Sequence, residues 1–199
     1  MTTQNDQLNY KYIFGRIFSL LVKPIQTWGK IRDSENASDT MMKIVYPMIG
    51  IISLLAFLKK IYLLGWGDAI SYQQALVYCC AIAVAYFVSF FLISFLSNKI
   101  MTLLYKLPDD KLTHQQLVGN VLIIFGALYA IKMFFPWTGL IIWIVQLYLG
   151  YVIWGGLVQL LVLEKKYQIF PMFFILILCI YIPDQSVRLF LQILTSGAI

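Results

Sequence analysis

Long apolar runs separated by short polar connections dominate the chain from residue 44 onward. The runs cover about residues 44 to 64, 73 to 97, 117 to 135, 138 to 163 and 169 to 194. A helix needs about 20 apolar residues to cross a hydrocarbon core of about 30 Å. The pattern therefore predicts an all-α, polytopic membrane helix bundle, with five transmembrane helices in a single membrane domain at residues 44 to 194.

Two of these runs admit a second interpretation. The first contains Lys59 and Lys60, which must snorkel to the far interface if residues 44 to 64 span the bilayer. A re-entrant hairpin at this position would leave four spans. The last run contains Pro183, so it can also end near Ile182 and continue as a terminal amphipathic helix on the membrane surface.

Residues 1 to 43 are polar or mixed and are predicted to form a cytoplasmic N-terminal segment. Within it, residues 8 to 31 alternate apolar clusters with basic residues, and Pro24 divides them into two short helices. Their apolar positions are spaced as one helical face that would enter lipid at the interface, while basic residues would meet anionic headgroups. A helix packed on the protein itself fits the same pattern. The apolar face comprises Phe14, Ile17, Phe18 and Leu21, and the predicted membrane-surface contacts are Arg16, Lys23, Trp28 and Lys30.

Composition supports a membrane protein. Hydrophobic residues make up 61% of the chain and charged residues 12%, with a mean hydropathy of +0.80, whereas soluble domains carry about 25% charged residues. With the N-terminus in the cytoplasm, 11 of the 15 Lys and Arg residues lie on that side, which predicts a cytoplasmic N-terminus and an external C-terminus. Because the net charge of +6 follows the loops, no nucleic-acid partner is predicted.

Ionisable and amide side chains inside the predicted spans are the candidate functional residues, because burying them in lipid is costly. Asp184 and Arg188 are spaced to pair on one helical face, and Lys132 lies near a helix end where it can snorkel. A structural role is favoured for all three. Asn120 and Gln146 complete this set of candidate intramembrane polar residues.

No pattern typical of a catalytic or metal site is present. The chain has one histidine, no HExxH, no GxSxG and no glycine-rich phosphate loop, and its three cysteines fall inside predicted helices. The sequence therefore predicts no enzyme activity, no metal and no cofactor.

Three glycines mark the fourth predicted span as a packing helix. At about 100° per residue, Gly150, Gly155 and Gly156 point in separate directions, and none are four residues apart. This spacing predicts that residues 138 to 163 pack against neighbours on more than one side. Close packing is favoured over a solute path along this stretch.

The order of elements resembles the Yip1 family of five-span membrane proteins, in its short bacterial form. The likeness is carried by the N-terminal VKPIQTWGKI and by the third and fourth spans, with Tyr129, Pro136, Tyr148, Gly150 and Gly156. It implies the five-span fold and a bacterial inner-membrane location. Eukaryotic members have a long polar N-terminal region and are associated with Rab GTPases; only about forty residues precede the first span here, so that partner is not carried over.

Two functions from different classes follow. The favoured one is a non-enzymatic scaffold or adaptor that binds membrane proteins or itself, or that shapes the bilayer through the N-terminal segment. The alternative is a small solute transporter or permease lined by the intramembrane polar residues. No inverted repeat is visible, as many transporters would show.

Overall fold

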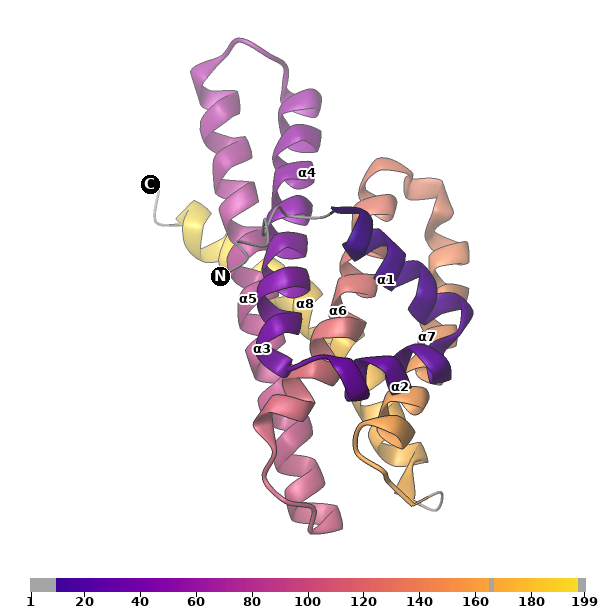
Figure 1. Ribbon diagram of the computed structural model, residues 1–199. Helices are drawn as coiled ribbons and strands as arrows, with labels where there is room; N and C mark the ends of the chain where they lie inside the picture. Colours follow the sequence, from indigo (N-terminus) through magenta and orange to yellow (C-terminus); the bar gives the residue numbers. More distant parts are fainter. Residues whose placement is uncertain (1–9, 165–166, 197–199) are drawn as a thin grey trace, which may run out of the picture.

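The computed structural model describes residues 10–164 and 167–196, and all regular structure in these residues is helical (Figure 1). Lys165 and Lys166, part of the predicted basic turn, and residues 1–9 lie outside the described residues. In chain order the elements are α1 (Tyr10–Val22), α2 (Pro24–Ser34), α3 (Ala37–Thr40), the π-helical turn η1 (Met41–Val45), α4 (Tyr46–Leu64), α5 (Ala69–Tyr105), α6 (Lys111–Phe134), the 3-10 turn η2 (Pro136–Thr138), α7 (Gly139–Gln159) and α8 (Ile169–Ser196).

Five of these helical segments are long and apolar enough to cross a membrane, as the hydropathy pattern predicts. They are Ser38–Leu64, Ala69–Tyr105, Lys111–Phe134, Pro136–Gln159 and Ile169–Thr195. The prediction of an all-α, five-helix membrane bundle is confirmed. The chain is a multi-pass integral membrane protein.

The two ambiguous runs are each one helix. α4 continues through both lysines to Leu64, and the chain then turns at Gly65 and Gly67, whose φ angles of 101° and 108° suit glycine. α8 continues past Pro183 to Ser196 without a break. The re-entrant hairpin and the separate terminal helix are therefore not what the structure shows.

Several helix bounds differ from the predicted runs, including the starts of α5 at Ala69 and of α6 at Lys111. α5 continues to Tyr105, beyond the apolar run that ends at residue 97, because its polar last turns remain helical and pack against the start of α6. α7 ends at Gln159, four residues before the predicted end, and Val162 adopts a left-handed φ of 49° in the connection that follows.

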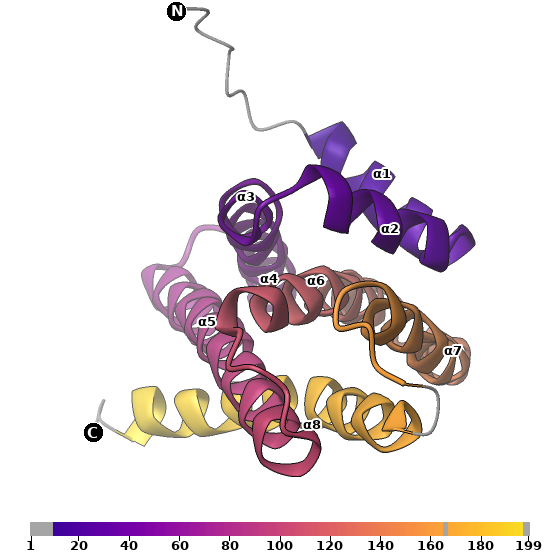
Figure 2. The same cartoon turned by 60° about the horizontal axis from the view of Figure 1, so that its bottom comes forward.

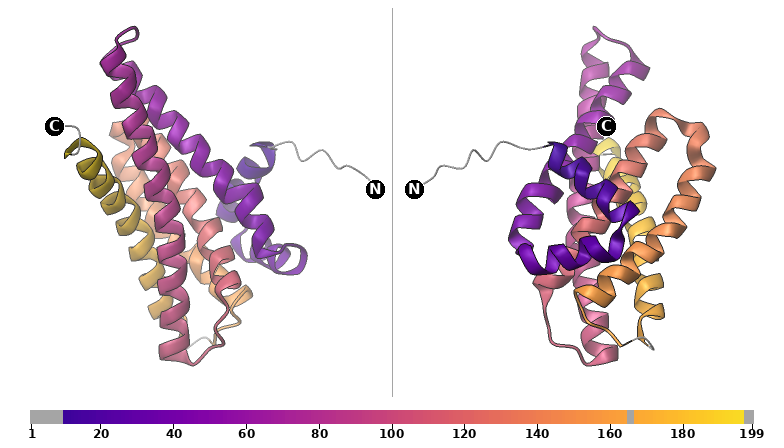
Figure 3. Two further views of the ribbon diagram at one scale, coloured as in Figure 1. Left: turned by 90° about the vertical axis from the view of Figure 1, so that its left-hand side faces the viewer. Right: turned by 45° about the vertical axis from the view of Figure 1, so that its right-hand side comes forward.

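α6 lies at the centre of the bundle and contacts α4, α5, α7 and α8 (Figure 2). The α5–α6 and α7–α8 connections lie at one end, called here the lower end, at the bottom of Figure 1. The α4–α5 and α6–α7 connections lie at the upper end, where the α4–α5 hairpin extends beyond the other helices (Figures 1 and 3). Successive long helices therefore alternate in direction, as five consecutive spans require.

α1 and α2 fold back against α6 and α7 (Figures 1 and 2). Trp28 is 0% exposed, and its indole Nε1 donates a hydrogen bond to the Val152 carbonyl of α7 at 2.8 Å. The prediction that Trp28 contacts the membrane surface is therefore wrong, since an indole with a buried partner on α7 packs as core. Amphipathicity alone could not distinguish a lipid-facing helix from one packed on its own protein.

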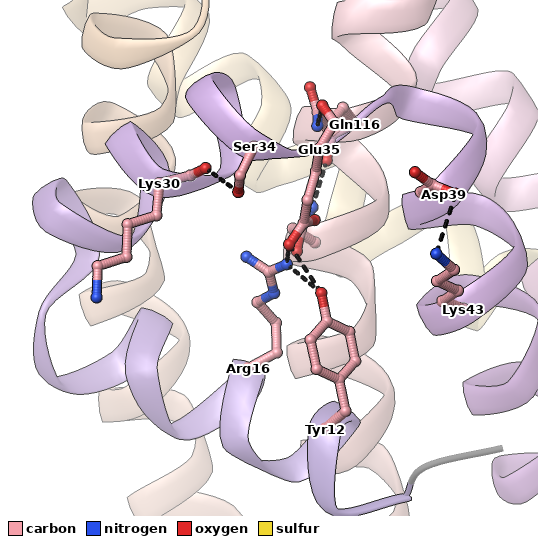
Figure 4. Close-up of polar contacts among 9 residues, drawn as sticks. Tyr12, Arg16, Lys30, Ser34, Glu35, Asp39, Lys43 and Gln116 are labelled. Atoms are coloured by element: carbon pink, nitrogen blue, oxygen red, sulfur yellow. Dashed lines mark hydrogen bonds and ion pairs between the residues drawn. The ribbon is translucent and has the colours of Figure 1, made fainter. Parts of the chain in front are cut away.

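Arg16 was also predicted at the membrane surface, and it is buried instead. Its guanidinium pairs with the Glu35 carboxylate and donates to the Tyr12 hydroxyl, and Gln116 of α6 donates to the Glu35 carbonyl (Figure 4). A buried guanidinium needs such partners to offset desolvation. These contacts tie the end of α2 to α6.

The predicted apolar face of α1 is partly buried against the protein and partly exposed at its surface. Ile17 is buried together with Ile13 and Leu20, whereas Phe14 and Phe18 are 56% and 68% exposed. The buried positions are spaced i, i+4 and i+7, so the packed stripe is rotated from the predicted one.

Candidate functional site

A cavity of about 420 Å³ lies among α5, α6, α7 and α8, toward the upper end of the bundle. Four of the five candidate intramembrane polar residues line it: Lys132, Gln146, Asp184 and Arg188. Because three different helices supply these side chains, their meeting is a property of the tertiary fold. The volume lies within the range of roughly 300–1,000 Å³ that is typical of small-molecule sites.

Each helix brings its polar side chain to the cavity for a local reason. Lys132 stands in the last turn of α6, just before Phe135 and Pro136 end the helix, and Gly139 opens α7 across the cavity. Gln146 follows two turns into α7. Asp184 and Arg188 are separated by one turn of α8, directly after Pro183.

The predicted pair on α8 forms. Nη2 of Arg188 lies 2.9 Å from Oδ2 of Asp184, and their side chains are 71% and 51% exposed, so the pair remains accessible from the cavity and the bundle surface. No carboxylate of residues 10–164 and 167–196 forms an ion pair with Lys132 within 4.0 Å. Two cations and one carboxylate give the cavity a net charge of +1.

Aromatic side chains form much of the remaining wall. Tyr86 of α5 and Tyr129 of α6 pack edge to face with ring centroids 5.9 Å apart, and the Tyr129 hydroxyl lies 3.2 Å from that of Tyr78. Trp143 completes the α7 side. Sequence reasoning missed these residues as site components, because an aromatic residue in an apolar run carries no sign of which neighbour it faces.

Below the cavity the bundle is closed. Leu149, Val152, Ile153 and Leu157 of α7 are each 0% exposed and belong to the same core as the facing residues of α6. Tightly packed side chains therefore separate the cavity from the lower end of the bundle.

Asn120 does not belong to this group. It lies deep in the lower half of α6, fully buried, and its Nδ2 donates to the Gln116 carbonyl at 2.9 Å. Its Oδ1 has no hydrogen-bond partner among the described residues. Asn120 thus contributes to the packed lower half and not to the cavity.

Gly150, Gly155 and Gly156 of α7 face different neighbouring helices. A Cβ on Gly156 would meet Leu117 of α6 and the Trp28 ring, and one on Gly155 would also meet Trp28. Gly150 faces α8 instead, at ordinary contact distance. The structure therefore places neighbours on more than one side of α7, and the Gly155–Gly156 pair forms the seat of Trp28.

A scan against family models, a search of curated proteins and a search of solved structures found no match to this chain. The fold and the cavity consequently rest on the chain's own geometry. The resemblance to the Yip1 family remains a prediction.

Proposed function

We propose that this integral membrane protein is a small non-enzymatic carrier that binds an anionic or zwitterionic solute in the α5–α8 cavity. The observation that carries this proposal is the convergence of Lys132, Gln146, Asp184 and Arg188 from three helices on one cavity of about 420 Å³. Sequence reasoning favoured a scaffold because the sequence shows no catalytic pattern and no inverted repeat. The convergence of these four side chains reverses that preference.

Charge selects the class of solute. Lys132 offers an ammonium group without a described carboxylate partner, and the Arg188 guanidinium can shift from Asp184 to an incoming carboxylate or phosphate. Asp184 can in turn receive a solute's amino group. Gln146 adds a donor and an acceptor, and the aromatic wall excludes water from one side.

The packed core closes the cavity toward the lower end, as expected for a carrier whose access to one side of the membrane is blocked. For orientation, the positive-inside bias supports a cytoplasmic N-terminus and lower end, in a bacterial inner membrane, with the cavity in the outer half of the bundle. The resemblance to the short Yip1-type proteins is consistent with this five-span topology.

Solute binding can be tested with the purified full-length protein in detergent. Melting temperatures are measured with and without a panel of small carboxylates, phosphates and amino acids, since a ligand that binds the native state raises the melting temperature. Wild-type protein should respond to at least one compound, and Lys132→Gln should lose most of that response. Lys59→Gln, which removes a charge at the same end but outside the cavity, should retain it.

The same melting experiment can also contradict the proposal that the cavity binds a solute. If no compound stabilises the wild type, or if Lys132→Gln and Arg188→Gln respond as the wild type does, the cavity is not a solute site. The scaffold function would then be preferred, because the exposed Phe14 and Phe18 of α1 form an apolar face available to a membrane-protein partner.

A further inference from the structure

A second site lies on the opposite side of the bundle from α8, on the N-terminal helices. A groove of about 240 Å³ runs along the α1–α2 junction and is lined by Phe18, Ser19, Val22, Lys23, Gln26, Thr27 and Lys30. One wall is apolar and the other carries two ammonium groups. The groove is independent of the cavity proposed above for solute binding.

The depth of this groove follows from two hydrogen bonds to α7. Tyr148 donates to the Leu21 carbonyl at 2.7 Å, and Trp28 donates to the Val152 carbonyl at 2.8 Å. Both α7 residues lie inside the span Pro136–Gln159. Tyr148 lies eleven residues before Gln159, about 16 Å along the helix axis, and Val152 lies seven residues before it, about 10 Å. The junction therefore reaches well into the thickness of the membrane from the lower end.

Two exposed lysines at this depth need a counter-charge. Lys23 and Lys30 are exposed, and no carboxylate of residues 10–164 and 167–196 forms an ion pair with either of them. The nearby carboxylates are engaged elsewhere, since Glu35 pairs with Arg16, Asp33 with Arg32 and Asp39 with Lys43. Figure 4 shows the Lys30 side chain directed away from the Arg16–Glu35 pair.

We infer that this groove binds an anionic phospholipid of the leaflet at the lower end. Lys23 and Lys30 contact its phosphate, Gln26 donates to its headgroup, and Phe18 with Val22 carries the start of an acyl chain. The charge of the two lysines complements the phosphate, and the long lysine side chains can extend from the inserted junction toward the headgroups at the lower end. This assignment keeps Lys23 and Lys30 as membrane contacts, although their neighbours Arg16 and Trp28 are buried in the protein.

The experiment compares lipid binding by the full-length protein in neutral detergent, using native mass spectrometry with added phosphatidylglycerol or phosphatidylcholine. Wild-type protein should retain phosphatidylglycerol preferentially, and Lys23→Gln with Lys30→Gln should reduce that preference by up to roughly thirtyfold, from the attraction of two basic residues near the surface. Inorganic phosphate should not compete, because the acyl chain supplies part of the contact.

The matched control is Lys106→Gln with Lys111→Gln, which removes two charges from the α5–α6 connection at the same end of the bundle. It should leave the preference for phosphatidylglycerol unchanged. Equal retention of the two lipids by wild-type protein would overturn the inference. So would an unchanged preference in the Lys23, Lys30 variant, an equal loss in the control pair, or displacement of the lipid by inorganic phosphate. Both lysine variants should show the same solute-induced rise in melting temperature as the wild type. The lipid experiment can therefore fail without affecting the test of the carrier function.

Discussion

Replacing Gly156 by alanine tests how the N-terminal segment is held on the bundle. A Cβ at this position would lie 2.3 Å from Leu117 Cδ1, and 3.1 and 3.2 Å from Cε2 and Cζ2 of Trp28. Both neighbours are fully buried, and the hydrogen bond to Val152 restrains the indole, so neither side chain can move away freely. The methyl group must therefore displace packed core atoms.

The magnitude follows from two opposing effects. Overpacking a well-packed core costs about 1–3 kcal/mol, and glycine to alanine in a helix gains up to about 1 kcal/mol. Three close contacts favour the first effect, so Gly156→Ala should lower the free energy of unfolding by roughly 1–2 kcal/mol. Gly150→Ala is the matched control on the same helix, because its Cβ would lie 3.6 Å from Leu176 and 4.0 Å from Met172. It should be neutral or slightly stabilising.

Thermal unfolding of the two variants and the wild type in the same detergent, followed by circular dichroism, makes the comparison. A Leu117→Ala background should relieve the clash, so the loss caused by Gly156→Ala should be at least roughly 1 kcal/mol smaller there. If Gly156→Ala unfolds at the same temperature as Gly150→Ala, the reasoning that Trp28 is seated tightly against α7 is refuted.

Three further predictions concern other contacts. Trp28→Phe removes the indole donor to Val152 and should lower the free energy of unfolding by about 1–3 kcal/mol, measured by the same thermal unfolding. Partial burial alone would raise the pKa of Asp110, but hydrogen bonds from Thr113 outweigh it and hold that pKa below its ordinary value. Asp110→Ala should therefore cost about 0.5–2 kcal/mol at neutral pH, and the difference from wild type should shrink as the pH falls below about 4 through the depressed pKa; a gap that stays constant down to pH 3 would argue against this cap. Asp184→Asn raises the net charge of the cavity from +1 to +2 and should strengthen anion binding roughly three- to tenfold. Titration with an anionic solute that stabilises the wild type measures this affinity. Weaker binding by Asp184→Asn would contradict the assigned charge balance.

Hydropathy alone predicted the membrane architecture, because each span must be apolar over its whole length regardless of its neighbours. The pairing of Asp184 with Arg188 was also predictable, since it depends only on one turn of one helix. Local rules of this kind do not require knowledge of the tertiary fold. They do require a continuous helix, which α8 provides.

The remainder depends on how the helices face one another. Lys132 and Gln146 meet the α8 pair only because α6 and α7 turn these faces toward α8, and an apolar helix carries little periodic signal to indicate that rotation. Trp28 was placed in the membrane interface for the same reason: aromatic residues suit both the interface and a core, and only the seat at Gly155 and Gly156 decides between them.

Solute uptake by the protein reconstituted in liposomes tests the carrier function most directly. The solute is the compound that gives the largest melting shift, supplied as a radiolabelled form to vesicles preloaded with the unlabelled compound. From the carrier function we expect exchange by wild-type protein and by Lys59→Gln. Exchange by Lys132→Gln and by Arg188→Gln should be at least tenfold slower, since each removes one charge-assisted contact worth about 1.5–3 kcal/mol. No exchange by wild-type protein above that of empty vesicles, or equal exchange by all four proteins, would contradict it.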